Sequence, residues 1–431
     1  MPSDTVTFVP VDKVEGQVAV PGDKSISHRA LIFSALASGI SRIEHLLIAD
    51  DIMSTVRCLR MLGVDIGLEG FTAVIKGNGI GGLRESDDIL NAGNSGTTAR
   101  IMLGLLSTQD FFSVITGDGS LRARPMKRMT IPLLAMGATL DGKEHANYLP
   151  IAVRGGRLKG IDYKMPVSSA QVKTGLIVAS MNAKGTMTIT EPVGTRDHTE
   201  RMLKASGVDL KTSDKTVQLA CSQRPLPMTM TVPGDFSSAA FFIGAAVIAR
   251  RSDILITGVG INPGRTGMLE VLKGMGASVE IINARFETGE PVADIHVQAS
   301  QLHGITVQDK RIIVSAIDEL PLIAVLAAYA QGRTVIRNAE ELRVKESDRI
   351  KAVVEGLTAL GVKAKELEDG FWVEGGGVRG GSVSSCGDHR IAMAFAVSSV
   401  ASEHEVRIGD FGVVSISFPE FMGIFNRVRG V

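Results

Sequence analysis

The segment at residues 20–30 combines residue types that bind anions. It reads Val-Pro-Gly-Asp-Lys-Ser-Ile-Ser-His-Arg-Ala and precedes an apolar run. The Pro-Gly-Asp triplet indicates a chain reversal, and the apolar run followed by Gly39 predicts a helix with a C-terminal glycine stop. Lys24, Ser25 and Arg29 would then lie at or near the helix N-terminus, where backbone N–H groups and the helix dipole favour an anion. A phosphate or carboxylate would fit there, but so would a capped surface helix with incidental charges.

A related sequence pattern occurs at residues 231–242. It has the same strand, the same Pro-Gly-Asp triplet and the same change from serine to apolar residues, but it lacks the lysine and the arginine. Two such phrases half a chain apart indicate duplicated halves, of which one keeps the charges.

The composition is that of a large, neutral, globular chain. A length of 431 residues predicts about two or three domains with an ample core. Lys and Arg together number 46, as do Asp and Glu, so the net charge is zero. This balance argues against a nucleic acid or an anionic membrane as partner, because both favour a basic surface. Any anion site must therefore come from local clustering.

The cysteines and the apolar runs exclude further classes. Three widely spaced cysteines make no metal-ligand pattern and no disulfide framework. No uncharged apolar run approaches the roughly 18 residues of a membrane span, and no secretory signal is recognisable. We therefore expect a cytoplasmic enzyme that does not bind membranes.

Two patterns recur at intervals of roughly 70 to 85 residues, longer than the usual solenoid periods. The first is a helix that ends in a glycine and leads into a strand, at Gly63, Gly137, Gly207, Gly276 and Gly361. The second is a polar cluster that opens an apolar helix, near Lys24, Asn94, Ser168, Phe236, Asp318 and Gly387. Together they predict six strand-and-helix units, three in each half, with a strand near residues 6–9 completing the sixth.

These repeats predict an α/β (α+β) fold with two similar domains, each of three pseudosymmetric strand–helix units. Residues 22–234 would form the cationic domain, and residues 1–21 and 235–431 the other, with crossovers near Pro21 and Pro233. If each half has threefold pseudosymmetry, its helix N-termini meet at one place. Two halves facing each other would then enclose a cleft, a favoured location for ligands.

Residues 77–82 fit the glycine pattern G-x-G-x-x-G, but they do not predict a dinucleotide site. Such a site would have an acidic residue about 20 positions further on, and none is present there. The same strand-and-glycine phrase recurs at residues 151–156 and 371–376. We therefore interpret it as a structural turn.

Two charged loops and two single residues remain as candidates. Residues 122–128 are densely basic, which also fits a solvated surface face. Residues 343–349 alternate in charge, which also fits an exposed helix with i,i+4 pairs. His389 is either functional or a packed or capping histidine. Cys386 has no evident base beside it, so we expect a buried small hydrophobic residue rather than a nucleophile.

Several long segments in the same order resemble the family of 5-enolpyruvylshikimate-3-phosphate synthase (EPSP synthase), or 3-phosphoshikimate 1-carboxyvinyltransferase. These segments are residues 21–29, 91–100, 117–126, 168–173, 343–349 and 387–390. The resemblance covers nearly the whole chain and implies the enolpyruvyl transferase fold, with two domains that close on substrate. It also implies transfer of the enolpyruvyl group of phosphoenolpyruvate to the 5-hydroxyl of shikimate 3-phosphate, with release of phosphate. That reaction belongs to the shikimate pathway to chorismate and aromatic amino acids. It implies an acid, a base and charged ligands, but neither a metal nor a cofactor.

The same resemblance implies roles for individual residues. Asp318 is expected near the 5-hydroxyl as base, and Glu346, with Lys24 beside it, is expected to handle the C3 proton. The implied phosphoenolpyruvate ligands are Lys24, Gly96, Arg124, Gln171, Arg349 and Arg390. The implied shikimate 3-phosphate ligands are Lys24, Ser25, Arg29, Ser169, Ala170, Gln171, Arg196, Asp318 and Lys345.

The chain departs from the family's common pattern at two places. Residues 416–419 lack the lysine that many members carry before Phe-Pro, and Ala170 stands where others have a second serine. The sequences of residues 94–100 and 343–349 resemble those of the class II branch of the family, which is often tolerant of the inhibitor glyphosate.

Two other functions are compatible with the same repeats. UDP-N-acetylglucosamine enolpyruvyl transferase has a similar fold but normally carries a cysteine in the loop corresponding to residues 117–124, and this loop has none. A non-catalytic anion-binding repeat protein would gain nothing from Asp318 and Glu346 among the cations. The partners that we expect are the two small substrates, bound by a monomer.

Overall fold

The computed structural model describes residues 4–431, which form two compact units. Unit 1 holds the chain up to Pro21, then Gly234–Arg285 and Pro291–Val431, and unit 2 holds Gly22–Pro233 and Phe286–Glu290. The short segment Phe286–Glu290 is the main difference from the division expected from the sequence. Each unit has its own core of buried apolar side chains.

Unit 2 contains three four-stranded sheets with their helices. The first repeat has the order β14(Thr229–Thr231), β3(Ser38–Glu44), β5(Thr72–Asn78), β4(Asp65–Glu69), with α1(Lys24–Leu36) and α2(Asp50–Met61). The second has β6(Leu90–Asn91), β7(Phe112–Thr116), β9(Tyr148–Arg154), β8(Thr139–Gly142), with α3(Gly96–Leu106), α4(Gly119–Arg122), α5(Lys127–Met136) and α6(Lys143–Ala146). The third has β10(Asp162–Lys164), β11(Thr186–Thr190), β13(Thr216–Ala220), β12(Lys211–Thr212), with α7(Ala170–Ser180) and α8(His198–Ala205).

Unit 1 repeats this plan. Its first sheet has the order β16(Ser278–Glu287), β17(Glu290–Gln298), β15(Arg251–Gly260), β2(Lys13–Ala19), with α9(Phe236–Ile248) and α10(Gly267–Gly274). The second has β18(Thr306–Val307), β19(Arg333–Ile336), β21(Gly370–Glu374), β20(Ala364–Leu367), with α11(Lys310–Ser315), α12(Leu320–Ala327), η1(Glu340–Val344) and α13(Arg349–Ala359). The third has β1(Val6–Phe8), β23(Val406–Gly409), β22(Gly381–Ser384), with α14(His389–Ser398), η2(Ser399–Ala401), η3(Phe411–Ile416) and α15(Phe421–Arg429).

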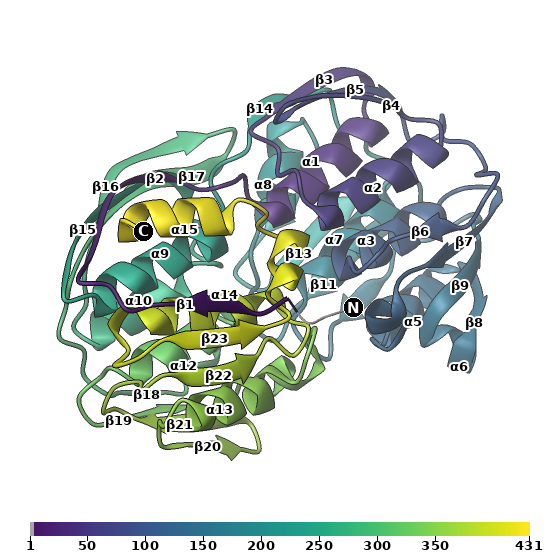
Figure 1. Ribbon diagram of the computed structural model, residues 1–431. Coiled ribbons are helices and arrows are strands. Elements are labelled where there is room, and N and C mark those ends of the chain that lie inside the picture. The colour runs from purple at the N-terminus through teal and green to yellow at the C-terminus, as the bar shows by residue number, and fades with distance from the viewer. Residues whose placement is uncertain (1–3) are drawn as a thin grey trace. The chain divides into compact units, whose positions relative to one another are not determined.

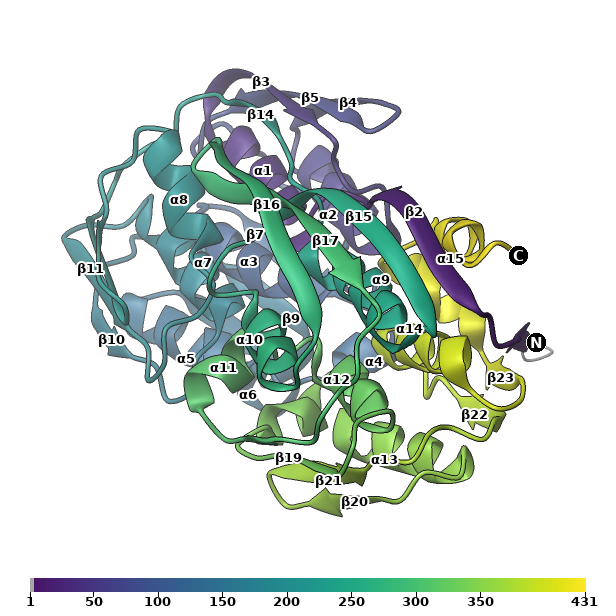
Figure 2. The ribbon, with the colours of Figure 1, turned by 90° about the vertical axis from the view of Figure 1, so that its left-hand side faces the viewer.

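All six repeats share one pairing pattern within residues 4–431. Each sheet has one parallel pair, such as β6 with β7 or β2 with β15, and its next strand is antiparallel. The last repeat follows the same rule, because β22 is parallel to β23 and β1 is antiparallel to it. Figure 1 shows β1 beside β23, and Figure 2 shows β2 beside β15. The predicted fold of six strand-and-helix units is confirmed, with the N-terminal strand completing the sixth.

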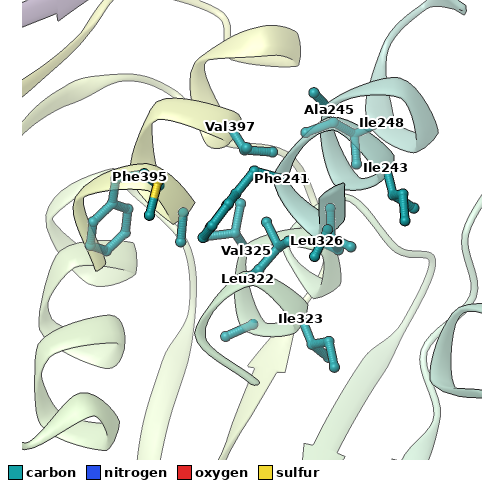
Figure 3. Packing of buried hydrophobic residues seen from close by; sticks show 14 of the residues in the cluster. Phe241, Ile243, Ala245, Ile248, Leu322, Ile323, Val325, Leu326, Phe395 and Val397 are labelled. Carbon is teal, nitrogen blue, oxygen red and sulfur yellow. The ribbon is translucent and has the colours of Figure 1, made fainter. Parts of the chain in front are cut away.

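One helix of each repeat is buried on all sides. All thirteen residues of α9 are buried, as are all eight of α12 and all ten of α14. A helix that is apolar all round belongs in a core. In unit 1, Phe241 of α9, Leu322 and Val325 of α12 and Val397 of α14 lie together (Figure 3). In unit 2, α3 and α7 pack so closely that a Cβ on Gly104 would lie 2.1 Å from the carbonyl oxygen of Gly175.

The N-termini of these buried helices carry the polar clusters found in the sequence. The side chains of Asp23, Ser95 and Ser169 cap α1, α3 and α7 by accepting backbone N–H groups. Asp235 and Asp388 cap α9 and α14 in the same way. The sixth central helix, α12, begins at Leu320 directly after Asp318 and Glu319. Because the helix bodies are buried, polar and charged side chains gather at these ends.

The expected glycine stops are correct at the five repeat positions and wrong at one other. The five repeat glycines have positive φ angles, between 83° and 101°. Gly39, however, does not end α1. The helix ends at Leu36, Ala37 already has extended backbone, and Gly39 lies inside β3. The chain passes directly from helix to strand there, so no left-handed cap is needed.

The glycine-containing segments at residues 77–82, 151–156 and 371–376, the first of which resembles a dinucleotide-binding motif, are places of close packing. A Cβ on Gly77 would lie 2.1 Å from the carbonyl oxygen of Ser34, near the end of α1. The corresponding contacts are 1.8 Å from Gly155 to the Gln109 oxygen and 1.6 Å from Gly375 to the Ala330 oxygen. Gly77 is the second-last residue of β5, and Gly155 and Gly375 directly follow β9 and β21. Each lies so close to backbone at or beyond the C-terminal end of a central helix that no side chain would fit.

Two glycines in helices of unit 1 test how tightly its core is packed. A Cβ on Gly356 of α13 would lie 2.2 Å from the Phe395 ring, which is fully buried, whereas Gly423 of α15 is exposed and faces open space. We expect Gly356→Ala to lower the free energy of unfolding by about 1–3 kcal/mol through overpacking. Gly423→Ala should raise it by up to about 1 kcal/mol through helix propensity.

Chemical denaturation of both variants, followed by circular dichroism, measures this difference. Equal stability of the two variants would contradict the tight packing of α13 against α14.

Candidate active site

The expected site residues divide between the two units. Unit 2 holds Lys24, Ser25, Arg29, Gly96, Arg124, Ser169, Ala170, Gln171 and Arg196. Unit 1 holds Asp318, Lys345, Glu346, Arg349 and Arg390.

The N-terminus of α1 presents Lys24 and Ser25. The ammonium group of Lys24 lies 3.0 Å from Asp51 Oδ2, at the start of α2, and both side chains are largely buried. Arg196, which precedes α8, donates a hydrogen bond from Nη1 to Ser25 Oγ at 3.1 Å. Two cations and a hydroxyl therefore converge near the start of one helix, as an anion site requires.

Arg29, in the second turn of α1, is buried. It donates hydrogen bonds to Thr199 Oγ1 at 2.8 Å, Thr174 Oγ1 at 2.7 Å and the carbonyl oxygens of Ser25 at 2.8 Å and Ala170 at 3.4 Å. Burial and the nearby Arg196 lower the pKa of Arg29 to about 10. Its guanidinium therefore links the first turns of α1, α7 and α8.

A second cationic cluster forms at the start of α3. Arg124 Nη2 donates to Asn94 Oδ1 at 2.7 Å, and Arg100 Nη1 donates to Gln171 Oε1 at 2.8 Å. A Cβ on Gly96 would lie 2.6 Å from Arg100 Nη1 and 3.5 Å from Arg124 Nη1. The structure thus brings Gly96, Arg124 and Gln171 together and adds Arg100, which the implied ligand sets omit.

The basic run at residues 122–128 is not one functional unit. Arg124 is 8% exposed and is held by Asn94, whereas Arg122 and Lys127 are exposed. The interpretation as a solvated basic face is therefore correct for the two exposed cations and wrong for Arg124.

The start of α7 is joined to the loop that carries Arg196. Ser169 Oγ accepts the Val172 N–H at 3.4 Å, and Ser168 Oγ donates to the Val193 carbonyl oxygen at 2.6 Å. Lys173 is buried and forms ion pairs of 2.8 Å and 2.7 Å with Glu191 and Glu200, on either side of that loop. These contacts hold the Arg196 loop against the first turn of α7.

In unit 1, Asp318 lies among three arginines. Arg265 Nη1 donates to Asp318 Oδ2 at 2.8 Å. Arg349 Nη1 lies 3.6 Å from Oδ1, and Arg390 Nη2 lies 3.8 Å from Oδ2. The Asp318 side chain is 13% exposed, so this carboxylate is largely removed from water but compensated by positive charge.

Arg265 was missed by the sequence analysis. It lies in the turn before α10, its side chain is 5% exposed, and its Nη2 donates to Ser237 Oγ and lies 3.4 Å from Asp235 Oδ1. The residue stands in an Asn-Pro-Gly-Arg phrase, outside the six polar clusters. That phrase predicts a turn, and nothing in it indicates that the arginine reaches Asp318.

Arg349 and Asp388 form a buried ion pair between the starts of α13 and α14. Arg349 Nε donates to Asp388 Oδ2 at 2.8 Å, and its Nη2 donates to Glu346 Oε2 at 2.7 Å. Burial acts to lower the pKa of Arg349, but the carboxylates of Asp388 and Glu346 outweigh this effect and raise it. Burial acts to raise the pKa of Asp388, and Arg349 outweighs it, so that pKa is lowered. Both groups are therefore held in their charged forms.

Arg390, Glu319 and Lys345 surround the same region. Arg390 Nη1 donates to the Asp318 carbonyl oxygen at 3.2 Å and lies 3.6 Å from Glu319 Oε1. Burial raises the pKa of Glu319 despite the nearby Arg265 and Arg390. Lys345 is half-buried, and desolvation, opposed by Asp318, lowers its pKa.

The segment at residues 343–349 and Cys386 both differ from an interpretation that the sequence allows. Residues 343–349 are not one exposed helix, because η1 ends at Val344 and α13 begins at Arg349, with a loop between them. Cys386 is exposed, not buried, and has a φ of 52°. The turn from β22 into α14 places it at the surface, while His389, the first residue of α14, is buried.

Within residues 4–431, no helix combines the length and the apolar character that crossing a membrane requires. Among the same residues, no cluster of three or more His, Cys, Asp and Glu side chains is arranged to hold a metal ion.

Comparisons with known proteins agree over almost the full chain. The family model described as EPSP synthase (3-phosphoshikimate 1-carboxyvinyltransferase) matches residues 9–425. A 3-phosphoshikimate 1-carboxyvinyltransferase from Desulforamulus reducens is 49% identical over 421 residues, which is 97% of this chain and 98% of the relative. A protein of the same name from Desulforudis audaxviator is 49% identical over 427 residues and 99% of both chains.

Solved structures show the same relationship. The EPSP synthase of Acinetobacter baumannii superposes with a TM-score of 0.88 at 42% identity and covers 98% of both chains. The enolpyruvyl transferase NikO of Streptomyces tendae superposes with a TM-score of 0.78 at 16% identity over 99% of this chain and 98% of its own, which shows a shared fold. The chain therefore belongs to the EPSP synthase (3-phosphoshikimate 1-carboxyvinyltransferase) family.

Proposed function

We propose how this chain's residues carry out the family's reaction, the transfer of the enolpyruvyl group of phosphoenolpyruvate to the 5-hydroxyl of shikimate 3-phosphate. The observation that supports the proposal best is the setting of Asp318. Its carboxylate stands at the start of a buried helix and lies within 4 Å of Arg265, Arg349 and Arg390. A carboxylate kept ionised among cations suits a general base that acts next to an anionic substrate.

The proposed chemistry is an addition followed by an elimination. Asp318 accepts the proton of the 5-hydroxyl as its oxygen bonds to C2 of phosphoenolpyruvate, while C3 receives a proton from Glu346, assisted by Lys24. Glu346 then takes a proton back from C3 as the bond from C2 to the phosphate oxygen breaks, and phosphate departs with the proton that Asp318 accepted. Glu346 accepts a hydrogen bond from Arg349, which fixes its position for this proton transfer.

The cationic residues hold the two polyanionic substrates. Lys24, Gly96, Arg124, Gln171, Arg349 and Arg390 are the proposed phosphoenolpyruvate ligands. Lys24, Ser25, Arg29, Ser169, Ala170, Gln171, Arg196, Asp318 and Lys345 are the proposed shikimate 3-phosphate ligands. Arginine forks suit carboxylate and phosphate because they donate two parallel hydrogen bonds. We also propose a monomeric, cytoplasmic enzyme.

One assay tests the reaction directly. Phosphate release is measured with phosphoenolpyruvate and either shikimate 3-phosphate or UDP-N-acetylglucosamine. We expect turnover with shikimate 3-phosphate. Turnover with the UDP-sugar alone would assign the chain the other enolpyruvyl transfer, and phosphate release with neither would favour a non-catalytic anion-binding protein.

Asp318→Asn tests the proposed base. We expect kcat to fall by about 10²–10⁴-fold, because an amide cannot accept the proton. The KM for phosphoenolpyruvate should change little, since Arg349 keeps Asp388 and Glu346 as partners and Arg390 keeps Glu319. Steady-state kinetics with both substrates measure the two constants, and a near-normal kcat would remove Asp318 from the base role.

Gly96→Ala tests the room beside the proposed phosphoenolpyruvate ligands. The added methyl group would press on Arg100 Nη1 and lie near Arg124. We expect the wild-type enzyme to be tolerant of glyphosate and the variant to be more so, because glyphosate is longer than phosphoenolpyruvate. The KM for phosphoenolpyruvate should rise by a smaller factor than the inhibition constant. An alanine variant with unchanged glyphosate inhibition would show that Gly96 does not line this pocket.

A further inference from the structure

Arg265 contacts Asp318 but belongs to neither implied ligand set. Its side chain is buried, and its guanidinium is held at two edges. Nη1 donates to Asp318 Oδ2 at 2.8 Å, and Nη2 donates to Ser237 Oγ and lies 3.4 Å from Asp235 Oδ1. Because Asp235 caps α9 and Ser237 lies in its first turn, Arg265 links the start of α9 to the residue that precedes α12.

We propose that Arg265 is a positioning residue for Asp318, which it holds ionised and in one orientation for the removal of the 5-hydroxyl proton. This inference rests on the proposed function of Asp318 as base. Arg265 itself touches neither substrate in this proposal and acts through Asp318.

The other two arginines are less suited to this task. Arg349 Nη1 lies 3.6 Å from Asp318 Oδ1, and the shorter hydrogen bonds of Arg349 go to Asp388 and Glu346. Arg390 Nη2 lies 3.8 Å from Oδ2, and its Nη1 donates to the carbonyl oxygen of Asp318 rather than to its carboxylate. A short hydrogen bond to a side-chain oxygen of Asp318 comes from Arg265.

The Ser237 hydroxyl connects Arg265 to a second carboxyl group, that of Glu319. Ser237 accepts a hydrogen bond from Arg265 and donates one to Glu319 Oε1. Burial raises the pKa of Glu319. A guanidinium that is fixed by Asp235 and Ser237 presents Nη1 to Asp318 in one direction, whereas a flexible lysine at the same place would not.

Several charged groups act on Asp318 together. Arg265, before α10, and Arg349 and Arg390, in the first turns of α13 and α14, lie within 4 Å of its carboxylate, and Lys345 and Glu319, before α13 and α12, also act on it. Glu346 and Asp388 pair with Arg349, and Asp235, at the start of α9, pairs with Arg265. An opposite charge within about 4–6 Å lowers a carboxyl pKa by about 1–3. Loss of Arg265 alone should therefore raise the pKa of Asp318, while the other cations still favour the carboxylate.

The pH dependence of kcat separates this role from a purely structural one. The base is active when ionised, so a raised pKa moves the acidic limb of the profile to higher pH. For Arg265→Met we expect that limb to move up by about one pH unit, and kcat below it to fall about tenfold. For Arg265→Lys the charge remains but the fork is lost, so we expect a lower kcat with the limb close to that of the wild type.

A double variant asks whether Arg265 acts through Asp318. In an Asp318→Asn background, Arg265→Lys and Arg265→Met should each change the residual kcat by less than about twofold, because coupled residues are not additive. Arg311→Met is the matched control. Arg311 also forms an arginine–carboxylate pair in unit 1, with Glu270, but that pair is exposed, and we expect an unchanged profile.

The outcomes are distinguishable. The positioning role would be overturned if Arg265→Lys and Arg265→Met both kept the acidic limb and the kcat of the wild type. It would also be overturned if their losses of kcat added fully to the loss caused by Asp318→Asn. Circular dichroism shows whether the Arg265→Met variant is misfolded. If it is, the Arg265→Lys variant alone tests the proposal: its kcat should be lower than that of the wild type, but the same substitution should have almost no effect in the Asp318→Asn background. A wild-type enzyme without turnover on shikimate 3-phosphate would contradict the proposed function itself.

Discussion

The burial of one helix in each repeat is the constraint on which the rest of the structure depends. Helices such as α9, α12 and α14 are surrounded by apolar side chains, so their bodies cannot carry charge. Their N-termini can, because each has backbone N–H groups without intrahelical partners. Charged and hydroxyl side chains therefore collect at the helix starts, and a structural requirement of the core also provides the groups that bind anions.

The two units use these helix starts differently. In unit 2 the starts of α1 and α3 present cations, with Lys24 paired to Asp51 and Arg124 held by Asn94. In unit 1 the starts of α12, α13 and α14 interleave carboxylates with arginines, and Arg349 with Asp388 is the most buried of these pairs. Such a pair gains little net stability because desolvation is costly. Its effect is to fix the neighbouring groups before any substrate arrives, which suits electrostatic catalysis.

Several arginines hold parts of the protein together, whether or not they also contact substrate. Arg29 joins three helices through hydrogen bonds to Thr199, Thr174 and two carbonyl oxygens, and Arg265 joins α9 to Asp318. A guanidinium can do this because it has five donors in a rigid plane. Residue type and position in a motif therefore do not separate a ligand from a support, and the hydrogen-bond partners must be known.

The sequence by itself determined the repeat number, the glycine ends of the helices, the polar helix starts and, through its motifs, the family. These features are local, since a glycine of positive φ or a capping serine leaves its mark within a few residues. Tertiary structure decided which side chains meet. Arg265 reaches Asp318 across 53 positions, Phe286–Glu290 belongs to unit 2, and Cys386 lies at the surface although Ser385 and Asp388 are buried. The physical reason is that such contacts depend on how helices and turns from distant segments pack, and sequence spacing does not record this.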